Sequence, residues 1–228
     1  MSSWFSPALF EFLTDLEANN NREWFEANKA RYERDVKEPA LRFIAAFAEP
    51  LASISPHFRA IPKAVGGSMF RLHRDTRFSA DKRPYKNNIG LHFRHEAGPD
   101  AHTPGYYLHL QPGECFVGLG LWMPDPPTLA RIRAQILAEP AIWGAMKASL
   151  AAASLPIGPD EQALKKPPRD APMDHPHRDD LRWKSFTIGR PMTEAEICAP
   201  DLMERYTALC QDGSPLVSFL CEAVGQPF

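Results

Sequence analysis

The chain has 228 residues, of which 44% are hydrophobic and 24% are charged, and its formal net charge is −2. This composition is typical of a folded globular protein and excludes extensive disorder, while the length suits a single domain with one core. A slightly acidic chain also lacks the broad basic surface of a general nucleic-acid-binding protein.

The N-terminal part of the sequence predicts helices separated by caps. Apolar residues recur at helical spacing in a first segment, at Phe10, Leu13 and Leu16. Asn20 and Glu23 fit a capping box, which predicts that a second helix begins at Asn20. Pro39 then either kinks this helix or opens a third one, which continues to about Ser53.

The middle of the sequence alternates between apolar and other residues with the period of a β-strand. This pattern predicts antiparallel strands at 89–94, 106–110 and 115–121, and a further strand at 68–73. One face of the sheet is apolar and packs against helices. The opposite face carries Arg71, His92, Arg94, Tyr107 and His109. Two interpretations stay open for this face: plain exposure to solvent, or a pocket formed where residues 69–90 fold over it.

The C-terminal part returns to helices. We expect, in order, a helix after Asp125, a weaker helix at 140–151, a long loop at 156–180, a strand at 183–188, a helix capped by Thr193 and Glu196 that ends at Gly213, and a last helix from Ser214. The long loop is either a functional cover or a poorly ordered excursion. The whole order predicts an α+β fold: N-terminal helices, a central antiparallel sheet of about four to six strands, and C-terminal helices, in one domain spanning 1–228.

The stretch MFRLHRDTRFSADKRPYKNNIG, residues 69–90, concentrates positive charge, and we call it the basic segment. It holds six basic residues against two acidic ones. Pro84 keeps the second half extended, so the segment should form a strand, a compact turn over 74–77 and an extended return. Such a loop can place several cations around one small anion.

The sequence therefore predicts a binding site for a phosphate or carboxylate group, and an enzyme acting on a small molecule is one form of it. The ligand-binding candidates are Arg71, Arg74, Arg77, Lys82, Lys86, Asn28 and His109. Asp75 or Asp81 would act as a general base or hold a divalent ion beside the phosphate, and Tyr85 would orient the ligand. The pattern identifies neither the ligand nor a cofactor.

Two alternatives to the anion site stay open. In the first, Asp75 and Asp81, with acidic residues of the first helices, pair with the basic residues in a structural network, and the protein is an interaction or scaffold module. In the second, which the acidic remainder of the chain disfavours, Phe78 and Tyr85 stack on nucleic-acid bases.

Three segments resemble one protein family: FEFLTDLEANNNREWFEANKARYERDV, the basic segment, and PGYYLHLQPGECFVGLGLWMPD. They resemble the conserved hypothetical proteins of bacteria and fungi grouped as domain of unknown function 2461. The resemblance runs over most of the chain and implies one structural unit. The family has no established activity, so the resemblance implies no substrate.

The N-terminus has no basic region followed by an apolar one, and no apolar run approaches the ~18 residues needed to cross a bilayer. We therefore expect a cytoplasmic protein without a membrane partner. Its four cysteines show no CxxC pairing, so we expect reduced thiols and no metal site; the oligomeric state is left open.

Overall fold

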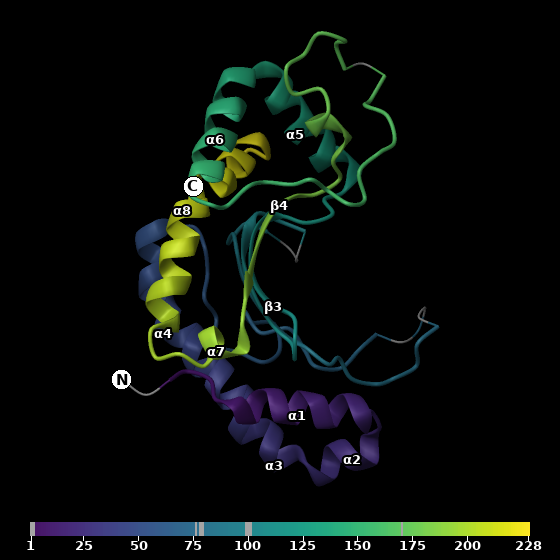
Figure 1. Cartoon of the computed structure of the whole chain (residues 1–228), viewed down its shortest axis with the longest axis vertical. Coiled ribbons are helices and arrows are strands. Elements are labelled where there is room, and N and C mark those ends of the chain that lie inside the picture. The colour runs from purple at the N-terminus through teal and green to yellow at the C-terminus, as the bar shows by residue number, and fades with distance from the viewer. Residues whose placement is uncertain (1–2, 76, 78–79, 99–101, 170) are drawn as a thin grey trace.

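The computed structural model describes residues 3–75, 77, 80–98, 102–169 and 171–228. Helices occupy both ends of the chain and a sheet lies between them, which confirms the α+β class (Figure 1). In chain order the elements are α1 (Pro7–Ala18), α2 (Arg22–Ala27), α3 (Lys29–Arg31), the π-helical η1 (Tyr32–Lys37), α4 (Glu38–Ile54), β1 (Ile89–Arg94), β2 (Gly105–Leu110), β3 (Cys115–Leu121), α5 (Pro126–Ala138), α6 (Pro140–Ala152), the 3₁₀ turn η2 (Asp180–Arg182), β4 (Phe186–Met192), α7 (Glu194–Ile197) and α8 (Leu202–Ala223).

The sheet has four antiparallel strands in the order β1-β2-β3-β4, at the lower end of the expected range. The segment 68–73, expected as a further strand, lies beside β1 without becoming one. It makes an isolated bridge from Met69 to Leu91, and the Phe70 amide donates to the Gly90 carbonyl at 2.9 Å. This edge contact brings the basic segment against the sheet.

One face of the sheet forms the core with α4 and α8 (Figure 1). Leu91 pairs with Leu108 and Phe93 with Tyr106, as the alternation predicts, and all four side chains are buried. Aromatic rings of the helices pack on this face; the centroid of Phe47, for example, lies 4.7 Å from that of Phe93. The outward residues of the strands therefore lie on the face turned away from α4 and α8.

The N-terminal helices differ from the expectation in their boundaries. Asn21, rather than Asn20, caps α2, because its side chain accepts a hydrogen bond from the Trp24 amide. The π-helical η1 then precedes α4, and Pro39 lies in the first turn of α4, which is the second of the two alternatives expected for it.

The expected break at Gly213 is wrong, because α8 runs without interruption through Gly213 and Pro215. A Cβ atom at position 213 would lie 2.7 Å from Cδ1 of Leu119, so glycine lets the helix approach β3 closely. The predicted capping box at Thr193 and Glu196 is present, but it caps the short α7.

Two aspartates tie the long loop to the rest of the fold. Asp160 accepts from the Lys184 amide at 2.6 Å, just before β4. Asp180 accepts from Trp143 Nε1 at 2.7 Å and from Lys147 Nζ at 2.6 Å, both on α6. These contacts anchor described residues of the loop to α6 and to the start of β4.

Within the described residues, no helix is both long enough and apolar enough to pass through a bilayer.

Candidate functional site

The basic segment forms a loop whose two limbs pair with each other. The Arg74 amide donates to the Pro84 carbonyl at 2.9 Å, and the Lys86 amide donates to the Leu72 carbonyl at 2.8 Å. The extended return is present as expected, whereas the outward limb makes only isolated bridges and is not the expected strand. The compact turn expected at 74–77 includes Thr76, which lies outside the described residues, as does Phe78.

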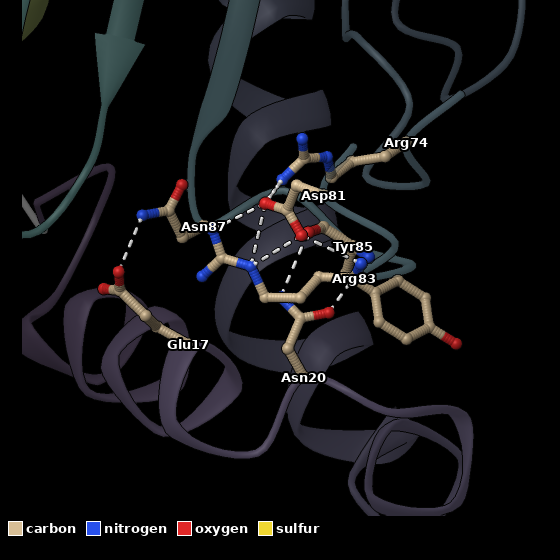
Figure 2. Close-up of polar contacts among 7 residues, drawn as sticks. All are labelled: Glu17, Asn20, Arg74, Asp81, Arg83, Tyr85 and Asn87. Carbon is tan, nitrogen blue, oxygen red and sulfur yellow. Dashed lines mark hydrogen bonds and ion pairs between the residues drawn. The ribbon is translucent and has the colours of Figure 1, made fainter. Parts of the chain in front are cut away.

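Asp81 lies between two guanidinium groups (Figure 2). It accepts from Nη1 of Arg74 at 2.6 Å and from Nη2 of Arg83 at 2.7 Å. The hydrogen bonds from Arg83, together with the contribution of Arg74, hold the pKa of the Asp81 carboxyl far below its usual range. A carboxylate held this way is a weak base, and the geometry favours a structural role for it.

Asp75 and Arg77 form a second pair. Nε and Nη2 of Arg77 donate to the two carboxylate oxygens at 3.0 and 2.7 Å. Hydrogen bonding from Arg77 lowers the pKa of Asp75 to about 2. The structural-network interpretation thus accounts for this pair and for the Asp81 contacts, while the roles of Asp75 and Asp81 in catalysis stay predictions.

Tyr85 lies in the core, and its ring stacks on Phe25 with the centroids 4.4 Å apart. Its backbone is fixed by Asn20, whose side-chain oxygen accepts from the Tyr85 amide and whose nitrogen donates to the Tyr85 carbonyl, both at 3.1 Å (Figure 2). Burial, with a smaller contribution from Glu26, raises the pKa of the Tyr85 hydroxyl. The structure therefore gives Tyr85 a packing role, and its expected role in orienting a ligand stays a prediction.

Asn28 has a local role at the end of α2. Its nitrogen donates to the Trp24 carbonyl at 2.9 Å, and its oxygen accepts from Arg31 at 3.3 Å. The structure therefore places Asn28 in the helix junction, and its expected contact with a ligand stays a prediction.

Lys86 and Arg71 remain outside these pairs. Within the described residues, no carboxylate lies within ion-pair distance of either side chain. Lys86 is partly buried, with Nζ 5.5 Å from the centroid of the Phe70 ring. Desolvation, and then the charges of Arg71 and Arg74, lower the pKa of Lys86. Lys86 is thus a cation without an ion-pair partner among the described residues, whereas Arg74 pairs with Asp81 and the charge of Arg71 acts on Asp75.

An open hollow of about 390 Å³ adjoins these cations, and we call it the basic hollow. Its lining residues are Arg74, Asp75, Lys86, Asn87 and Asn88. Asn87 donates to Glu17 of α1 at 3.2 Å, which fixes the end of the basic segment against the first helix (Figure 2). Lys82, another expected ligand residue, is exposed on the same segment.

A second depression, of about 520 Å³, lies on the outward face of the sheet, and we call it the sheet cleft. Glycines and aromatic residues dominate its lining, which comprises Phe70, His92, Thr103, Gly105, Tyr107, His109, Phe116, Gly118, Leu119, Gly120, Trp122, Thr187, Ile188 and Gly189. The face expected to be either exposed or a pocket is therefore hollowed. The predicted site residue His109 lies here, on the lining of the sheet cleft and outside that of the basic hollow.

Inside the sheet cleft, His109 is held by two polar contacts. The Tyr107 hydroxyl lies 2.8 Å from Nδ1 of His109, and Oε1 of Gln111 lies 3.2 Å from Nε2. Since Nε2 of Gln111 donates to Glu114, its Oε1 is the acceptor; Nε2 of His109 then carries the proton and Nδ1 accepts from Tyr107. Burial lowers the pKa of His109, which favours the neutral ring.

The sequence reasoning did not identify Phe70, Phe116 and Gly189 as candidate site residues. A signal for the sheet cleft was present: glycines recur at outward positions of neighbouring strands, as Gly118 and Gly189 do in register. Among the described residues, no group of three or more His, Cys, Asp or Glu side chains is arranged to hold a metal ion.

The sequence matches the model of one protein family. A family model described as a conserved hypothetical protein (DUF2461) matches residues 8–219, which is most of the chain. No curated protein matches the sequence. The chain therefore belongs to the DUF2461 family.

Proposed function

We propose that this protein binds a small molecule bearing a phosphate or carboxylate group, which it holds in the basic hollow. The observation that carries the proposal is the position of Lys86. Its ammonium group lines the hollow beside Arg74, and no carboxylate of the described residues pairs with it. Arg71 lies close enough for its charge to act on Lys86.

The hollow offers donors suited to such an anion. The ammonium group of Lys86 has three, and Arg74 uses only Nη1 in its described contact with Asp81, so its other nitrogens keep their donors. Asn87 and Asn88 add side-chain amides to the lining. A guanidinium and an ammonium group can together bind the oxygens of one phosphate.

Electrostatics also favour an anion here. Two like charges about 5 Å apart repel by roughly 3 kcal/mol at an effective dielectric constant near 20. An anion between Arg74 and Lys86 removes much of this repulsion. The structural-network alternative accounts for Arg77, Arg83 and one contact of Arg74, but leaves Lys86 uncompensated.

The test is thermal unfolding in phosphate and in citrate, against sodium chloride at the same ionic strength. We expect either anion to raise the unfolding midpoint of the wild type. Lys86→Met keeps the aliphatic stem and removes the charge, and should abolish this rise. Lys166→Met, at an exposed lysine of the long loop, is the matched control and should respond like the wild type. An equal response in Lys86→Met, or no response in the wild type, refutes the proposal.

A further inference from the structure

We propose that the sheet cleft binds the planar aromatic part of the ligand, while the anionic group of the same molecule reaches Lys86. The ligand class is then an aromatic or heteroaromatic organic anion. This inference rests on the proposed function, because it assigns the second half of the same binding site.

The floor of the sheet cleft is backbone left bare by glycine. Gly118 and Gly189 are opposite each other on β3 and β4. A Cβ atom at Gly189 would meet no atom within 4 Å, so packing inside the protein does not require glycine there. Glycine within a strand costs about 0.5–1 kcal/mol compared with residues that have a side chain. Close approach of a ligand to the backbone is one physical reason for a glycine within a strand, and it fits the open space here.

Other glycines of the sheet cleft have reasons within the fold. A Cβ atom at Gly105 would lie 2.8 Å from Nε2 of His92, and one at Gly120 would lie against the Phe186 carbonyl. These two allow close packing of the chain on itself. Gly189 differs from them because the space in front of it is open.

The walls of the sheet cleft suit a flat ring. His109 and Phe116 stack with centroids 4.7 Å apart and planes 13° from parallel, so they present a flat surface. Trp122 lines the same cleft and is 56% exposed, unusual for a large aromatic side chain. Aromatic walls of this kind bind planar rings by stacking and by burial of apolar area.

One buried polar atom also lacks a partner at this site. Thr103 lines the sheet cleft and is 4% exposed, and within the described residues its Oγ1 makes no hydrogen bond. Buried hydroxyl groups are normally hydrogen-bonded. A polar atom on the ring of the ligand can complete this bond.

Phe70 connects the two halves of the proposed site. Its ring lines the sheet cleft, 6.0 Å from the ring of Tyr107, and Lys86 Nζ lies 5.5 Å from its centroid. The ammonium group thus lies within about one ring width of the aromatic wall. Lys86 lines the basic hollow and not the sheet cleft, so the proposed ligand places its ring in the cleft and its carboxylate on the Lys86 side of Phe70. The volume also falls within the range of about 300–1,000 Å³ that is typical of small-molecule sites.

The experiment compares acids with their neutral amides of the same shape. The probes are 2-naphthoate with 2-naphthamide and indole-3-carboxylate with indole-3-carboxamide, measured by isothermal titration calorimetry. For the wild type we expect at least one acid to bind about tenfold more tightly than its amide, which corresponds to ~1.4 kcal/mol. Lys86→Met should make the two affinities equal by weakening only the acid.

Variants at Gly189 test the position of the ring. The series Gly189→Ala, Gly189→Val and Gly189→Leu fills the open space step by step, so acid and amide should both bind progressively more weakly. Arg190→Leu changes the next, exposed residue of β4, whose side chain points to the other face, and is the control expected to bind normally. Far-UV circular dichroism and the unfolding midpoint show that each variant is folded, and Gly189→Ala provides the comparison if Gly189→Leu does not fold.

The outcomes separate this inference from the proposed function. If Gly189→Leu loses the aromatic acid but keeps the response to phosphate, both are supported. The inference is overturned if no acid binds better than its amide, or if the Gly189 series leaves binding unchanged, while the phosphate response persists. It is also overturned if the wild type is a dimer in sedimentation that Gly189→Leu dissociates, because the cleft is then an interface between two copies. Loss of the phosphate response itself refutes the proposed function.

Discussion

Asp180 offers the most direct test of how the long loop is held on the fold. Its side chain is only 10% exposed, and it accepts hydrogen bonds from Trp143 and Lys147 of α6. Asp180→Asn keeps the size of the side chain and an acceptor for Trp143, but it removes the negative charge. The ammonium group of Lys147 then has no counter-charge at this position.

The expected cost follows from the burial of the pair. Breaking a fully buried ion pair costs about 3–5 kcal/mol, and an exposed pair contributes about 0.2–1 kcal/mol. The Lys147 side chain is 29% exposed. The pair lies between these limits, and we expect Asp180→Asn to lower the free energy of unfolding by about 2 kcal/mol. For a chain of this size, that loss lowers the unfolding temperature by about 4–8 °C.

Urea denaturation and differential scanning calorimetry measure both quantities. Asp179→Asn, at the preceding residue, is the matched control, because the Asp179 side chain is 88% exposed and lies 3.7 Å from Arg182. We expect this variant to change the free energy of unfolding by no more than about 0.5 kcal/mol. Adding Lys147→Met to Asp180→Asn should recover most of the loss, since the unpaired charge is gone and a side chain of similar length remains beside Trp183. Equal stabilities of Asp180→Asn and Asp179→Asn, or no recovery in the double variant, would refute the reasoning.

Three further predictions concern the basic segment. Lys86→Met should raise the unfolding midpoint without any anion, because it removes a partly desolvated cation. This gain should shrink as the pH rises from the lowered pKa of Lys86 in the folded state toward the unfolded value of about 10.4, because wild-type Lys86 then loses its charge as well. Thermal unfolding of both proteins between pH 7 and about 10 measures the gain. Asn20→Ala removes both hydrogen bonds to the Tyr85 backbone and should cost about 1–3 kcal/mol in urea denaturation, whereas Asn19→Ala, at an exposed neighbour, should stay within about 0.5 kcal/mol; equal effects contradict the assigned role. The carboxyl group of Asp75 should titrate near pH 2 by ¹³C NMR, so the stability from its pairing is complete above about pH 4 and lost as the pH falls toward 2. In Arg77→Gln the titration midpoint of Asp75 should return toward about 3.9. An unchanged titration midpoint excludes Arg77 as the cause of the lowered pKa.

Local patterns predicted the sheet well, because its strands are short and neighbours in sequence. The alternation from Ile89 onward matches β1, and the hairpins place Leu108 and Tyr106 on the core face as expected. The same reasoning failed where a residue serves a distant contact. Gly213 resembles a helix stop, but it is needed for the approach of α8 to Leu119 of β3, which no local pattern records.

Asn20 illustrates the same limit within the first helices. Asparagine before a helix predicts a cap, and Asn21 does cap α2. The adjacent Asn20 instead binds the backbone of Tyr85, 65 residues away. Two identical residues side by side therefore have different roles, and only the tertiary fold separates them.

For the candidate site, the sequence predicted where positive charge gathers, but not which charges are neutralised. Asp75 pairs with Arg77 and Asp81 with Arg83, each two residues along, so these contacts are local in origin. Lys86 has no acidic residue at this spacing, which is consistent with its position outside the pairs. Its contact with Phe70 depends on the pairing of the two limbs of the segment and was not predictable from spacing.

The hollowed face of the sheet, which we propose as a binding surface, comes from a pattern that alone indicates only a polar face. Alternation placed His92, Tyr107 and His109 on one face, and for an antiparallel sheet that pattern fits plain exposure equally well. The hollow arises because Gly118 and Gly189 have no side chain on this face, while the rings of Tyr107 and Phe116 project from it beside them. A face built only for exposure to water would gain stability from a side chain at Gly189, because a Cβ atom there meets no atom within 4 Å. The open space at Gly189 therefore supports the proposal that a ligand binds this face, over the interpretation of plain exposure to solvent.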